Sequence, residues 1–110
     1  MSQNLAQEIA AKKLINIYNH ASIGSAQQLA TIASLGRVGG EEAAKKLINI
    51  YDHASIGSSQ QLAAVVALGA VGSESAAKKL VNIYDHASIG SKQQLAAITA
   101  LGEVGRLPGN

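Results

Sequence analysis

The chain has 110 residues, of which 15% are charged and 3% are aromatic, and its formal net charge is +2. It contains no cysteine, which excludes disulfides and thiolate chemistry. No apolar run approaches the roughly 18 residues of a membrane span, and the basic excess is well short of the clustered lysine and arginine typical of nucleic-acid binding. These features predict one soluble domain in the cytoplasm, without a membrane partner.

The most informative feature of the chain is a repeat with a period of 33 residues. A Lys-Lys-Leu triplet begins at Lys12, Lys45 and Lys78, and each triplet is followed at fixed spacings by a tyrosine and a histidine. Such a period is typical of stacked repeats, in which each unit needs its neighbours to bury its apolar face. We therefore expect a single repeat domain over residues 1–110, with units at about 10–42, 43–75 and 76–108.

Taken in order, the chain predicts two helices in each unit. Residues 2 to about 21 have the amphipathic pattern of a helix that is longer than its later equivalents. In the second unit, the same pattern predicts helices over about 42–54 and 59–70. Gly57 can adopt the left-handed conformation that ends a helix, and the S-x-x-Q sequence that begins at Ser58 forms a capping box. Each unit is thus a helix, a tight turn and a second helix, called helix A and helix B below.

The apolar side of these helices defines the expected core. It combines large aliphatic residues with one tyrosine per unit, on the arc that an amphipathic helix turns inward. The expected core residues are Leu14, Ile17, Tyr18, Leu29, Ile32, Leu35, Leu47, Ile50, Tyr51, Leu62, Val65, Leu68, Leu80, Ile83, Tyr84, Leu95, Ile98 and Leu101.

The junction between units carries a resemblance to a known family. The run from Ala67 to Gly72, followed by the helix start from Ala76 to Val81, resembles the short HEAT-like repeats named after phycobilisome lyases. The junction recurs at 34–39 and 100–105, so the resemblance covers almost the whole chain. It implies an all-α fold, a right-handed α-solenoid of three 33-residue helix-turn-helix repeats. Rows of helix A then lie on one surface and rows of helix B on the other.

Two features depart from that family. The turn inside each unit is longer, and Gln60 and Gln61 stand where the family has an arginine early in helix B. The family's ladder of aspartate and arginine between neighbouring repeats is therefore not expected here in its usual form.

A second resemblance lies in the turns. The stretch from Ala87 to Leu95 is similar to the S-N-I-G-G-K-Q-A-L stretch of TAL-effector-type DNA-binding repeats, and it implies base contacts followed by phosphate contacts. Helix B is shorter than in that family, the turns begin with the same residues in all units, and only one turn has a lysine. Nucleic acid is therefore the alternative partner. Its contact residues would be Ser55, Ile56 and Gly57 in the second unit, and Ser88, Ile89, Gly90, Ser91, Lys92 and Gln93 in the third.

Histidines are the residues that most suggest metal binding or catalysis. His20, His53 and His86 occur once per unit, and packed helices lie about 8–10 Å apart, whereas zinc requires nitrogen ligands at about 2.0–2.1 Å. We expect these imidazoles to lie at solvated helix ends and to meet the terminal carbonyls. The sequence also lacks a recognisable nucleophile motif and the glycine patterns of phosphate-binding loops. It therefore predicts no enzyme, no metal site and no cofactor.

The positions at which the units differ indicate a binding surface. Apart from conservative core changes and the end of the chain, the differences between the second and third units fall on helix B. Stacked repeats bind on the extended surface that they create, so the sequence predicts a non-enzymatic scaffold for protein binding or self-assembly. Near-identity elsewhere is typical of recent duplication or of deliberate consensus design. The expected contact residues are Ala26, Ala30, Ser34, Arg37, Ser59, Ala63, Ala67, Ala70, Lys92, Ala96, Ala100 and Glu103.

The two ends of the repeat array differ in their polarity. Thr99 and Glu103 replace apolar residues of the preceding unit, and we expect them to cover the C-terminal end with polar side chains. The first helix instead adds Leu5 and Ile9 with no comparable polar change. A self-complementary patch closes under two-fold symmetry, so the sequence predicts a homodimer through this helix. The alternative is a monomer in which polar neighbours cover the patch.

Overall fold

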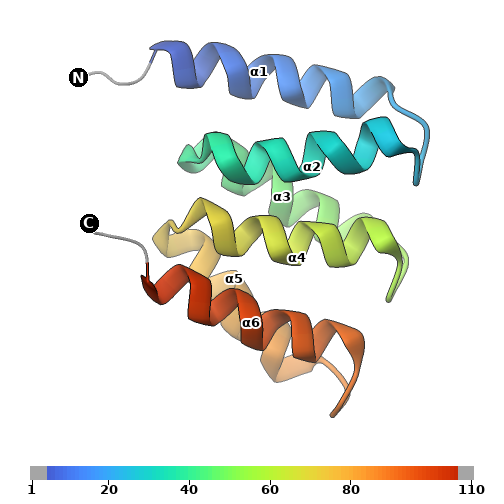
Figure 1. Cartoon of the computed structure of the whole chain (residues 1–110). Helices are drawn as coiled ribbons and strands as arrows, with labels where there is room; N and C mark the ends of the chain where they lie inside the picture. Colours follow the sequence, from blue (N-terminus) through green and yellow to red (C-terminus); the bar gives the residue numbers. More distant parts are fainter. Residues whose placement is uncertain (1–4, 107–110) are drawn as a thin grey trace.

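The computed structural model describes residues 5–106, and within this range it contains six α-helices and no strand (Figure 1). The all-α prediction is therefore confirmed. The expected domain and its third unit reach residues 1–4 and 107–110, which lie outside the described residues. The helices are α1 (Leu5–His20), α2 (Ala26–Val38), α3 (Gly40–His53), α4 (Ser59–Val71), α5 (Glu74–His86) and α6 (Lys92–Arg106).

Helices α2, α4 and α6, one helix B from each unit, lie side by side (Figure 1). The contacts of α4 with α2 and with α6 are the most extensive between helices of the described chain. Helices α3 and α5 pack behind this row, and α1 packs against α2 and α3. The chain thus forms a thin slab of 41 × 35 × 17 Å. We call α2, α4 and α6 the front row.

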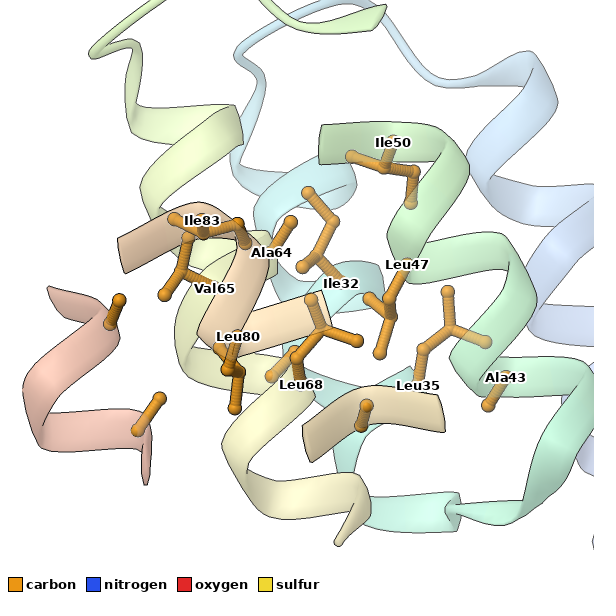
Figure 2. Packing of buried hydrophobic residues seen from close by; sticks show 14 residues of the cluster. Ile32, Leu35, Ala43, Leu47, Ile50, Ala64, Val65, Leu68, Leu80 and Ile83 are labelled. Carbon is orange, nitrogen blue, oxygen red and sulfur yellow. The ribbon is translucent and has the colours of Figure 1, made fainter. Parts of the chain in front are cut away.

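A continuous apolar core lies between the front row and the helices behind it (Figure 2). Alanines on α3, α4, α5 and α6 fill the spaces between the larger side chains. The sequence prediction of the core is confirmed for the large aliphatic residues that are fully buried. The largest buried aliphatic side chains come from four consecutive helices: Ile32 and Leu35, Leu47 and Ile50, Val65 and Leu68, and Leu80 and Ile83.

The expected core is wrong in the third unit. Leu95 and Ile98 are 55% and 50% exposed, and Tyr84 is 41% exposed. Val65, the equivalent of Ile98, is fully buried. The difference arises because the third unit lies against Val65, whereas no helix of the described chain follows α6.

Two glycines set the close approach between helices of the front row. A Cβ atom placed at Gly36 would lie 2.9 Å from the Cα and Cβ of Ala67, and one at Gly69 would lie 3.0 Å from the same atoms of Ala100. Only glycine allows another backbone to come so near. We call these two contacts, Gly36 with Ala67 and Gly69 with Ala100, the glycine seam. Because Ala67 and Ala100 are buried there, the expectation that they are contact residues for a partner is wrong.

Each turn between helix A and helix B is fixed by one serine and one glutamine. Ser58 Oγ accepts a hydrogen bond from the backbone N–H of Gln61 at 3.1 Å, as the capping box predicts. Gln61 Oε1 accepts from the N–H of Gly57 at 2.8 Å, one residue earlier than a standard capping box would reach. Gly57 has a φ of 77°, which glycine adopts without strain. The same contacts hold the other turns, through Gly24, Ser25 and Gln28 and through Gly90, Ser91 and Gln94.

The glycine seam predicts opposite effects for one substitution at two equivalent positions. Gly69→Ala places a methyl group against Ala100 and should lower the free energy of unfolding by about 1–3 kcal/mol. Gly102→Ala places its methyl group where nothing beyond the local backbone of α6 lies within 4 Å, and it should raise that free energy by about 0.5–1 kcal/mol. Chemical denaturation of both variants measures the difference. Changes of the same sign would contradict the seam.

The turn contacts predict a second pair of unequal effects. Gln61→Ala removes the acceptor of the Gly57 N–H at a buried site and should cost about 1–2 kcal/mol of stability. Gln94→Ala removes the equivalent bond at a more exposed site, where water replaces it, and should cost less. Thermal and chemical denaturation give both values. Equal losses would show that burial of the glutamine does not matter.

Candidate interaction surfaces

The outer face of the front row carries most of the predicted contact residues. Two of them, Ala67 and Ala100, are buried in the glycine seam and are not available to a partner. Three are half-buried, namely Ser34, Ala63 and Ala96. The exposed ones are Ala26, Ala30, Arg37, Ser59, Ala70, Lys92 and Glu103.

The sequence interpretation missed one row of this face. Ala33, Val66 and Thr99 are exposed, and Val66 is 65% exposed. Each lies four residues before a predicted contact residue, as Ala33 does before Arg37, so helical spacing is the signal that could have found the row. Because Thr99 and Glu103 lie on the outer face, the prediction that they cover the C-terminal end is wrong.

A groove of about 440 Å³ lies between α4 and α6 on this outer face. Alanine side chains leave it hollow, and Glu103 brings a carboxylate to its rim. Glu103 also pairs with Arg106 at 3.3 Å, but an exposed pair of this kind contributes little. The groove is therefore mostly apolar with one acidic edge. Its lining residues are Val66, Ala70, Ala96, Thr99, Ala100 and Glu103.

A smaller hollow of about 210 Å³ lies where α1 meets the start of α3. Gln7 Nε2 donates to the carbonyl oxygen of Val38 at 2.8 Å and holds α1 over this junction. Glu8, Glu41 and Glu42 bring exposed carboxylates to the hollow. Among residues 5–106, however, no group of three or more His, Cys, Asp or Glu residues is placed to hold a metal ion. The described residues of this hollow therefore do not form a set of ligands for a metal ion.

A polar ladder links each helix A to the next. Lys46 Nζ donates to Asn19 Oδ1 at 2.9 Å, between α3 and α1. Lys79 Nζ donates to Asp52 Oδ1 at 2.8 Å, between α5 and α3. Each contact joins a lysine of the later unit to a side-chain oxygen of the earlier one. We call these two contacts the lysine ladder.

Each lysine of the ladder also lies over a tyrosine ring. Lys46 Nζ is 4.9 Å from the centroid of the Tyr18 ring, and Lys79 Nζ is 5.4 Å from that of Tyr51, distances at which cation and ring attract. Burial lowers the pKa of Lys46 from its ordinary value. Burial raises the pKa of Tyr51, and the nearby Asp52 carboxylate raises it further. The ladder is thus partly withdrawn from water, which strengthens its electrostatic contacts.

The three histidines are engaged by their own helices. Their Nδ1 atoms lie 2.8, 2.9 and 2.9 Å from the carbonyl oxygens of the residues four positions earlier, Asn16, Asn49 and Asn82. A carbonyl oxygen only accepts, so Nδ1 carries the proton. The expectation that the imidazoles meet carbonyls at the helix ends is confirmed.

The turns between helix A and helix B lie along one edge of the slab (Figure 1). Ile56 and Ile89 are 84% and 95% exposed there. The N–H groups of Gly57 and Gly90 are bonded to glutamine side chains, so they are not available to a phosphate. Of the other residues of the nucleic-acid alternative, Ser55, Ser88 and Lys92 are exposed, and Ser91 and Gln93 are half-buried.

The residues of the predicted dimer contact lie on α1. Leu5 is 71% exposed and Ile9 is 61% exposed. Both side chains are therefore accessible, and the two-fold dimer stays a prediction.

Comparisons of the chain with family models, with curated proteins and with solved structures found no match. None of the helices between residues 5 and 106 is both long and apolar enough to cross a membrane.

Proposed function

We propose that this chain is a non-enzymatic, HEAT-like repeat scaffold whose outer face binds a protein partner. The proposed architecture is a right-handed α-solenoid of three 33-residue helix-turn-helix repeats. Three features support it: the helices of the front row lie side by side, the glycine seam recurs between consecutive units, and the lysine ladder recurs behind it. A stack of this kind presents an extended surface for binding.

The groove between α4 and α6 is the observation that carries the proposed function. Its alanine lining and the side chain of Val66 suit a compact aliphatic group of a partner. The carboxylate of Glu103 at the rim favours a lysine or arginine beside that group. The equivalent positions in α2 and α4 are Arg37 and Ala70, so each unit offers a different rim. We therefore propose a partner segment with one aliphatic anchor and a neighbouring basic residue.

Selection from a random peptide library, with the full chain as target, tests this surface. Peptides that bind the groove should share an aliphatic residue close to a lysine or arginine. Val66→Glu should abolish their binding, because it places a charge in the apolar groove. Glu103→Gln should weaken binding by about two- to fivefold, the size expected for an exposed ion pair.

Ile56→Glu is the matched control for this selection. Ile56 is also aliphatic and is more exposed than Val66, but it lies in a turn and not at the groove. Circular dichroism establishes that both variants fold. Peptides that still bind after Val66→Glu, or that lose binding with Ile56→Glu, would contradict the proposed surface.

Nucleic-acid binding through the turns is the second candidate, favoured by the exposure of these turns along one edge (Figure 1). Against it, Lys92 stands beside a single turn. Of the exposed lysines of helix A, Lys45 and Lys78 lie in the half of their helices that is remote from the turns. Protein binding is therefore the preferred function.

A salt titration with labelled duplex DNA separates the two candidates. Phosphate contacts release counterions, so the affinity of a nucleic-acid-binding chain falls steeply as salt rises. The protein-binding proposal expects no retention of DNA even at low salt. Fluorescence anisotropy measures the binding. Retention at low salt that is lost with Lys92→Ala would favour the turns over the groove.

Self-assembly is the other part of the proposed function. A two-fold dimer through α1 is one form of it, and the exposure of Leu5 and Ile9 supports that form. A dimer of this kind has a molecular mass that does not rise above that of two copies as the concentration increases. The residues at the N-terminal and C-terminal ends of the helix rows support a different form of self-assembly.

A further inference from the structure

The third unit leaves open a face that the earlier units bury. Val65 in α4 is fully buried, whereas the equivalent Ile98 in α6 is 50% exposed. Leu95, one turn earlier in α6, is also exposed. Behind it, Val81 and Tyr84 in α5 are exposed where their equivalents in α3 are half-buried. We call Val81, Tyr84, Leu95 and Ile98 the C-terminal face.

The C-terminal face also carries one half of each contact that joins consecutive units. Gly102 holds the seam position in α6, and nothing beyond the local backbone of α6 lies within 4 Å of a Cβ placed there. Asp85 holds the position of Asp52, whose carboxylate accepts a hydrogen bond from Lys79. Asp85 is exposed, beside the exposed ring of Tyr84. A further unit stacked here would bring a small residue to the seam and a lysine to the ladder.

The first unit presents the matching halves at the opposite end. Lys13 holds the ladder position and is exposed, whereas the two ladder lysines are half-buried. Ser34 in α2 holds the position of Ala67 in the seam, and it is half-buried where Ala67 is buried. Leu14 and Ile17 in α1 are half-buried where their equivalents in α3 and α5 are buried. We call Lys13, Leu14, Ile17 and Ser34 the N-terminal face.

We propose that the N-terminal face of one copy stacks on the C-terminal face of a second copy. The contact continues the one that already joins the units within the chain, so Lys13 donates to Asp85 above the ring of Tyr84. Ser34 lies against Gly102 in the same way as Ala67 lies against Gly36. This inference rests on the proposed repeat scaffold and names its partner, which is the chain itself.

Charge on the outer face supports the same arrangement. Arg37 in α2 and Glu103 in α6 hold equivalent positions of the first and third units, and both are exposed. Head-to-tail stacking places them on neighbouring helices with opposite charge, which favours this register over others. In the ladder, Lys13 of the first unit and Asp85 of the third unit form a second pair, again with the positive charge on the first unit and the negative charge on the third.

The proposed contact joins two different faces, so it is heterologous. Each added copy presents a new C-terminal face and a new N-terminal face, and growth does not stop at two copies. Burial of the exposed aliphatic side chains of the C-terminal face drives the association. A two-fold dimer through α1 would instead close on itself.

Analytical ultracentrifugation over a wide range of concentration tests the proposal. The weight-average mass of the full chain should rise continuously past the dimer. Gly102→Ala should abolish this rise because its methyl group fills the seam position, although the same change should stabilise the single chain. Ile98→Glu should abolish it as well. Ile89→Glu, a change of the same residue type in the same unit at a 95% exposed turn position, is the control that should leave assembly intact.

A charge exchange and a mixing experiment test the pairing of the two faces. Lys13→Asp or Asp85→Lys alone should weaken assembly, and the double variant that carries both should recover it. Ser34→Arg blocks the N-terminal face and Ile98→Glu blocks the C-terminal face, so each variant alone should stay monomeric. Their mixture should form a complex of one copy of each and grow no further.

Three outcomes would overturn the proposal. The first is a monomer mass at every concentration, and the second is assembly that survives both Gly102→Ala and Ile98→Glu. The third is a closed dimer that is lost when Leu5→Glu is combined with Ile9→Glu, which would place the contact on α1. Binding of groove peptides is measured separately and depends on Val66. The head-to-tail contact and the protein-binding surface can therefore fail independently.

Discussion

The rest of the structure depends on the close approach of the front-row helices at the glycine seam. Gly36 and Gly69 have no Cβ atom, so Ala67 and Ala100 lie directly against the neighbouring backbone. This approach fixes how far apart consecutive units stand. The contact from Lys79 to Asp52, 2.8 Å between the polar atoms, joins the same two units as the seam contact of Gly69 with Ala100. A larger residue in the seam would therefore loosen both layers of the slab, because interiors packed to high density transmit such a displacement.

Much of the fold could be predicted from the sequence because its signals are strong and repeated. The period predicted the repeat, and glycine followed by a serine cap predicted the turns. The errors concern the seam residues Ala67 and Ala100, the expected core residues Tyr84, Leu95 and Ile98, and the expected end cover of Thr99 and Glu103. Alanine suits a seam as well as an exposed surface, so helical projection could not tell Ala67 from Ala70. An apolar pattern identifies the side that a helix can bury, but Ile98 remains exposed because burial also needs a neighbour.

The candidate surfaces were less predictable than the fold, and the reason is again physical. The interior of each unit is constrained by the seam, the core and the turns, which leave little room for change. The outer face lies outside these constraints. Its rim position is therefore Arg37, Ala70 or Glu103 in the three units, without loss of packing between the stacked helices. The groove beside Val66 exists because two helices with small side chains meet there. No short motif records such a groove, since it depends on the spacing between α4 and α6.

Stacking of copies and binding at the outer face would reinforce each other. In a head-to-tail assembly the outer faces join into one surface, and each copy adds one groove of the kind formed by α4 and α6. A partner that carries several anchors would then bind many weak sites at once, and its avidity would exceed the affinity of a single groove. The groove residue Val66 belongs to neither end face, so occupancy of the groove does not compete with stacking. The same 33-residue period that builds the chain would thus set the spacing of sites along the assembly, because each junction reproduces the contact between units.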